Sequence, residues 1–178
     1  MTKPRVVGLD LSLTSTGVCV AVAGGPVTVD RLKPPKGARG VERLRYLREV
    51  VGYAAGGCDL AVVEGPSFGS RSSSMDQIHA LHWFVRDELD HLGVPAAVMS
   101  PAGRAMYATG KGNAGKDEVL VSVVRDYPAV PVTGNDMADA LVLAAAGLEH
   151  LGHPLRRLPK THTRALAKVQ WPTPKETP

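Results

Sequence analysis

The stretch VVGLDLSLTSTGVCVAVAGGPVTVDRL, residues 6–32, determines how the chain begins to fold. Apolar and β-branched residues are concentrated in three short runs, which is typical of β-strands. A polar Ser/Thr turn separates the first two runs, and Gly24-Gly25-Pro26 separates the last two. The three runs cover residues 6–11, 18–23 and 27–32. Strands joined by such short connections predict an antiparallel β-meander.

Beyond residue 32, apolar residues alternate between helical spacing and short runs of β type. Helical spacing predicts helices over residues 41–55, 78–92, 101–108, 117–127 and 136–151. Two further strands are expected over residues 59–64 and 96–99. A β-meander followed by this alternation predicts an α/β fold in which helices flank a mixed five-stranded sheet.

The 178 residues are enough for one domain with a sizeable core, which we assign to residues 1–151. Residues 152–178 are rich in proline and basic side chains, and they are expected to form a C-terminal tail or extended arm. The chain has a net charge of +4, and this tail holds six of its 21 Lys and Arg residues but one acid. A basic tail favours a polyanionic partner, although one that only aids solubility is the alternative.

The composition also limits where the protein works. No apolar run approaches the ~18 residues that a transmembrane helix needs, and the first residues do not resemble a signal peptide. Cys19 and Cys58 follow no disulfide pattern, so we expect buried thiols in a reducing compartment. We therefore expect a cytoplasmic protein that is not bound to a membrane.

Four carboxylates end or follow apolar stretches of this chain: Asp10, Glu64, Asp136 and Asp139. Burying such acids together is unfavourable unless their charges are paired, and divalent cations with oxygen ligands provide that pairing. Asp136 and Asp139 are three residues apart on an expected helix, so their side chains share a face. Two cations held by such a set can support phosphodiester hydrolysis. Alternatively, Asp136 only caps its helix and Asp139 lies at the surface.

The order and spacing of several motifs resemble the RuvC-type Holliday junction resolvases, a branch of the RNase H-like superfamily. The matching segments extend over most of residues 5–150. They are Gly8-Leu9-Asp10-Leu11-Ser12 with Thr16-Gly17, Val62-Val63-Glu64, Gly112-Asn113-Ala114-Gly115-Lys116, and Asp136-Met137-Ala138-Asp139-Ala140-Leu141. The resemblance implies a homodimeric endonuclease that cuts four-way DNA junctions by paired nicking.

The same resemblance implies roles for individual residues. The four acids would bind Mg²⁺ or Mn²⁺, with two ions in each active site, and Lys116 would stabilise charge that develops at the phosphate. The second basic residue of the family matches Arg104 best, with Lys111 as the alternative, and Arg104, Lys111 and Lys116 are expected to contact DNA. Phe68 would contact bases at the crossover, as an exposed aromatic in a polar loop can by stacking.

Other functions fit the residues less well. Residues 110–116 match the start of a P-loop, but no strand precedes them and Asp117 replaces the required Ser or Thr, so no nucleotide cofactor is expected. Asp117 is interpreted as the N-cap of the following helix. His79 and His82 lack further zinc ligands nearby and are expected at the surface or an interface. An RNase H-like nuclease acting on other branched DNA, flaps or RNA-containing substrates is the main alternative, ahead of a non-catalytic DNA-binding module.

Overall fold

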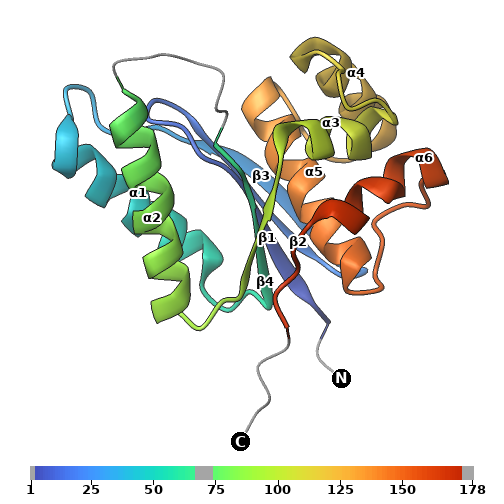
Figure 1. Ribbon diagram of the computed structural model, residues 1–178, viewed down its shortest axis with the longest axis horizontal. Coiled ribbons are helices and arrows are strands. Elements are labelled where there is room, and N and C mark those ends of the chain that lie inside the picture. Colours follow the sequence, from blue (N-terminus) through green and yellow to red (C-terminus); the bar gives the residue numbers. More distant parts are fainter. Residues whose placement is uncertain (1–2, 67–73, 174–178) are drawn as a thin grey trace, which may run out of the picture.

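The computed structural model describes residues 3–66 and 74–173. A β-sheet lies at the centre of the fold (Figure 1). The sheet has five strands among the described residues, in the order β3-β2-β1-β4-β5. They are β1 (Arg5–Asp10), β2 (Thr16–Val22), β3 (Val27–Leu32), β4 (Leu60–Glu64) and β5 (Ala96–Met99). The predicted β-meander and the mixed five-stranded sheet are confirmed.

The strand register brings two predicted site residues to one edge of the sheet. β1 pairs antiparallel with β2, and it pairs parallel with β4 on its other side. Asp10 and Glu64 are the last residues of β1 and β4. Because neighbouring parallel strands end at the same edge of a sheet, both carboxylates emerge on the same side of the fold.

Helices cover both faces of the sheet and bury a separate apolar cluster against each (Figure 1). On one face lie α1 and α2, and on the other lie α3, α4 and α5, as predicted from the apolar spacing. Their bounds are α1 (Gly40–Ala55), α2 (Met75–His91), α3 (Pro101–Thr109), α4 (Lys116–Asp126) and α5 (Asn135–His150). In the described part of the chain, no helix is both long and apolar enough to span a bilayer.

Helix α5 is buried along most of its length. Every residue from Met137 to Leu148 is buried. The helix packs directly on β1 and β2 because Gly8 and Gly17 carry no side chain. A Cβ on Gly8 would lie 2.1 Å from the carbonyl oxygen of Ala140, and a Cβ on Gly17 would lie 1.9 Å from that of Asp136. These glycines bring the start of α5 close to the end of β1.

The segment after Leu151 differs from the expected tail. It contains α6 (Lys160–Thr163) and a 3₁₀ helix, η1 (Arg164–Lys168), and Gln170 forms an antiparallel bridge with Val98 of β5. Ala165 is buried against the body of the protein. Local composition suggested an arm because the apolar partners of this segment lie far away in sequence.

The N-cap of α4 and the state of the two cysteines were also predicted from the sequence. Helix α4 begins at Lys116 with Gly115 as its N-cap, so Asp117 lies within the first turn and does not cap the helix. An acid there still interacts favourably with the helix dipole. Cys19 and Cys58 are free and buried, as predicted.

Candidate metal centre

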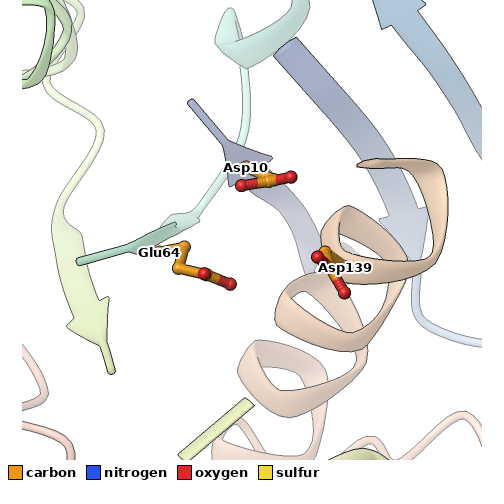
Figure 2. A group of neighbouring side chains, drawn as sticks. All are labelled: Asp10, Glu64 and Asp139. Carbon is orange, nitrogen blue, oxygen red and sulfur yellow. The ribbon is translucent and has the colours of Figure 1, made fainter. Parts of the chain in front are cut away.

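Three of the four predicted acids converge at the edge where β1 and β4 end (Figure 2). Asp10, Glu64 and Asp139 each offer a carboxylate oxygen, and these oxygens all lie within 4.8 Å of one another. Asp10 and Glu64 come from the sheet, and Asp139 comes from α5. The predicted convergence of sheet and helix acids is therefore present for these three residues.

Burial raises the pKa of two of these acids, Asp10 and Asp139. Burial, together with the negative charges of Glu64 and Asp139, raises the pKa of Asp10 to about 8, against the opposing charges of Arg104 and Lys116. Burial also raises the pKa of Asp139 to about 6, against the opposing charge of Arg104. Without a cation, the cluster therefore holds protons that it would release in water.

The guanidinium of Arg104 lies among these carboxylates. Its Nε donates to Oε2 of Glu64 at 2.5 Å, and its Nη1 donates to Oδ1 of Asp139 at 2.6 Å. Arg104 is 5% exposed, because α3 turns this side chain inward. The sequence identified it as a basic residue of the site, but its direct contacts are with acids of the cluster.

Asp136 lies one helical turn before Asp139 and outside the group of three. Its Oδ2 accepts a hydrogen bond from Oγ of Ser15 at 2.5 Å. Ser15 belongs to the turn between β1 and β2. The hydroxyl of Thr16 stabilises this turn by donating a hydrogen bond to the carbonyl oxygen of Ser12. No role was predicted for Ser15, and the one sequence feature that pointed to it was its place in a Ser/Thr-rich turn. Sharing a helix face was not enough to bring both acids into one cluster.

The remaining predicted site residues differ in exposure. Lys116 is exposed at the start of α4, yet its charge lowers the pKa of Asp10 and of Asp139, so it lies within electrostatic reach of both. Lys111 is exposed and pairs with Glu118 at 2.8 Å. Phe68 lies outside the described residues.

His82 is a neighbour of the cluster that the sequence assigned to a surface or an interface. It is 7% exposed and lines a cavity together with Asp10 and Glu64. Burial lowers the pKa of His82 to about 4, so the imidazole is neutral near pH 7. Its position three residues after His79 gave no sign of this, because the cavity forms only when α2 packs beside the sheet.

The donor set fits a hard divalent cation. Carboxylate oxygens are the ligands that Mg²⁺ and Mn²⁺ prefer, and this site gathers three of them with mutually repelling charges. Arg104 compensates part of the negative charge, yet Glu64 and Asp139 still add to the effect of burial in raising the pKa of Asp10. A bound cation would favour the ionised form of these acids.

A sheet of this order, with carboxylates at the ends of its two central strands and on the helix across them, defines an RNase H-like nuclease. Solved structures agree in fold. Thermus thermophilus RuvC has a TM-score of 0.67 at 23% identity, covering 84% of this chain and 97% of that chain. The T. thermophilus RuvC complex with a Holliday junction substrate has a TM-score of 0.66 at 22% identity and the same coverage.

Sequence comparison is more specific. The crossover junction endodeoxyribonuclease RuvC of Synechococcus sp. (strain WH7803) is 33% identical over 153 residues, which cover 80% of this chain and 97% of that relative. No protein-family model matches the chain. The chain belongs to the RuvC family, in agreement with the resemblance noted from its motifs.

Proposed function

We propose that this protein is a metal-dependent endodeoxyribonuclease that resolves four-way DNA junctions. The observation that carries the proposal is the convergence of Asp10, Glu64 and Asp139, whose oxygens lie within 4.8 Å of one another in a chain of the RuvC family. The Synechococcus relative is itself named a crossover junction endodeoxyribonuclease.

We further propose that these acids, with Asp136, hold Mg²⁺ or Mn²⁺, and that two ions occupy each active site. When bound, such ions lower the pKa of water and stabilise charge on a phosphodiester during in-line displacement. Asp10, whose pKa of about 8 keeps its carboxyl protonated near pH 7, would give up its proton on binding the ions. Asp136, which already lies one turn from Asp139, would reach the site by exchanging its hydrogen bond from Ser15.

The basic residues of the site have separable tasks in this proposal. Arg104 neutralises Glu64 and Asp139 from within the protein, where it is shielded from solvent. Lys116 is exposed, so it is free to meet the phosphate and to stabilise charge in the transition state. Lys111 would break its ion pair with Glu118 and contact the DNA backbone. Phe68 would stack on a base at the crossover.

Paired nicking of opposite strands requires two active sites, so we propose that the working form is a homodimer. Trp83 on α2 supports this, because a side chain of that size is 67% exposed and lines a cavity with Gly65, the residue after Glu64. The two buried free cysteines are consistent with a reducing compartment such as the cytoplasm.

The decisive experiment uses a synthetic four-way junction with labelled arms, incubated with and without Mg²⁺. We expect symmetric nicks in Mg²⁺ that leave 5′-phosphate and 3′-hydroxyl ends, and no product in chelator. Asp10→Asn should abolish cleavage while junction binding persists. Undiminished cleavage by that variant would refute the site assignment.

Parallel reactions on forks, flaps and RNA–DNA hybrids separate this activity from the alternative. The acidic cluster alone is compatible with any RNase H-like nuclease, so substrate choice has to be measured. Preference for the four-way junction by an order of magnitude or more is the expected result. Equal or faster cleavage of the other substrates would assign the protein to the broader class.

A further inference from the structure

The segment after α5 is fastened to the body of the protein at several separate points. The indole ring of Trp171 stacks on the imidazole of His150, with ring centroids 4.0 Å apart and planes within 5°. Gln170 pairs with Val98 at the edge of the sheet, and Ala165 is buried. Arg156 forms a salt bridge with Asp126 at 2.6 Å. These contacts make the segment a fixed part of the surface.

This fixed segment lies against the loop that joins α3 to α4. A ring nitrogen of His162 in α6 is 2.9 Å from the carbonyl oxygen of Tyr107 in α3. A Cβ on Gly110, the first residue of the loop, would lie 3.2 Å from the same histidine ring. The loop carries Lys111 and leads to Lys116, two of the proposed DNA contacts. Figure 1 shows α6 beside α3 on the same face of the sheet.

The segment after α5 is rich in basic side chains. No acid occurs between Glu149 and Glu176. Four exposed basic side chains form what we name the C-terminal basic surface: Arg157, Lys160, Arg164 and Lys168. None of the four is in an ion pair within residues 3–66 and 74–173. Unpaired cations held on an ordered surface create a local positive potential that attracts polyanions.

Two of these cations lie about one helical turn apart. Lys160 and Arg164 are four residues apart where α6 continues into η1, so they occupy neighbouring positions along one side of the helical stretch. Arg156 forms an ion pair with Asp126, whereas its neighbour Arg157 is exposed. Phosphate contacts fix the position of DNA without reading its sequence, and they need only such solvent-facing cations.

We propose that the C-terminal basic surface binds the phosphate backbone of one arm of the junction, extending the DNA contact from the α3–α4 loop. This inference rests on the proposed function, because a four-way junction supplies an arm leading away from the active site. It assigns a binding role to residues that lie outside the acidic cluster and outside every motif of the family resemblance.

The test compares two single charge removals on this surface with one charge removal elsewhere on the protein. Lys160→Ala and Arg164→Ala each remove one cation from the surface, and Lys3→Ala removes one at the opposite end of β1 from Asp10. The binding of each full-length variant to a labelled four-way junction is measured in chelator over a range of salt concentrations. Thermal unfolding checks that the variants remain folded.

Each surface variant should weaken binding at low salt by about three- to tenfold and reduce the slope of log K against log salt by about 0.9. Lys3→Ala should match the wild-type protein. Slopes for Lys160→Ala and Arg164→Ala that equal the wild-type slope would overturn the inference and leave the surface with a solubilising role.

Cleavage by the wild-type protein, assayed separately in Mg²⁺, distinguishes the two proposals. Cleavage with unchanged slopes overturns the basic surface alone. Reduced slopes without cleavage support the surface and overturn the resolvase activity. Failure of the wild-type protein to bind a four-way junction overturns both.

Discussion

The guanidinium of Arg104 donates a hydrogen bond to Asp139 at a distance of 2.6 Å. The positive charge of Arg104 therefore lies among carboxylates that are suited to binding a metal ion. A second contact at 2.5 Å joins the same guanidinium to Glu64. The pairing is almost fully desolvated, since the Arg104 side chain is 6% exposed and that of Asp139 is 2% exposed. Arg104 therefore affects both the stability of the metal-free fold and the charge available to a metal.

The first prediction concerns Arg104→Ala. Removing one member of a buried ion pair leaves its partners uncompensated and costs about 3–5 kcal/mol of unfolding free energy. Mg²⁺ should restore part of this loss, because a bound cation replaces the missing charge and stabilises the folded state by mass action. Thermal unfolding in chelator and in millimolar Mg²⁺ measures both effects.

Lys111→Ala is the control for that prediction. It breaks the exposed pair with Glu118, and exposed pairs contribute about 1 kcal/mol or less. Its unfolding temperature should respond to Mg²⁺ as the wild-type protein does. An Mg²⁺ response in Arg104→Ala no larger than that of the wild-type protein would contradict the role given to Arg104.

The second prediction follows from Asp10. Its pKa in the metal-free fold is about 8, above the ordinary 3.8, so the folded state retains a proton that the unfolded state loses. The resulting stability is fully present below the ordinary pKa and is lost as pH rises through about 8. Asp10→Asn lacks this proton, so its stability should fall less steeply over that window, by up to about 1.4 kcal/mol per pH unit.

Urea unfolding of both proteins in chelator at several pH values checks this expectation. Asp139 is present in both proteins, so the difference between the two curves isolates residue 10. Metal-free Asp10→Asn should also be the more stable protein near pH 8, since it buries no ionisable acid at that position. Parallel stability curves would show that Asp10 titrates normally.

The third prediction tests how closely α5 must approach the sheet. A Cβ on Gly8 would lie 2.1 Å from the carbonyl oxygen of Ala140 and 2.5 Å from the amide nitrogen of Ala144. Because both are backbone atoms of α5, Gly8→Ala should cost about 3 kcal/mol or more and shift Asp139 away from Asp10. Gly56→Ala, whose nearest atoms lie at 3.6 Å, should change stability by about 0.5 kcal/mol or less. Urea midpoints provide the comparison.

The sequence predicted the sheet and two of its acids because strand patterns and strand ends are local properties. Asp10 and Glu64 needed only the parallel pairing of β1 with β4 to meet. The inward turn of Arg104 depends on how α3 packs, which its own sequence does not determine. The fixed C-terminal segment was missed for a similar reason, since Trp171 finds its partner, His150, on a helix that ends before the segment starts.

The last prediction separates charge stabilisation from DNA binding at Lys116. This exposed lysine lowers the pKa of Asp10 and Asp139, so its charge reaches the reacting centre while its side chain remains free to meet a phosphate. Lys116→Ala should reduce the single-turnover cleavage rate by about 10²–10³-fold, the effect of losing one group that stabilises transition-state charge. Junction affinity should fall far less, because one phosphate contact among many is lost. Lys3→Ala is the matched control with unchanged rate. A fall in affinity as large as the fall in rate would make Lys116 a binding residue alone.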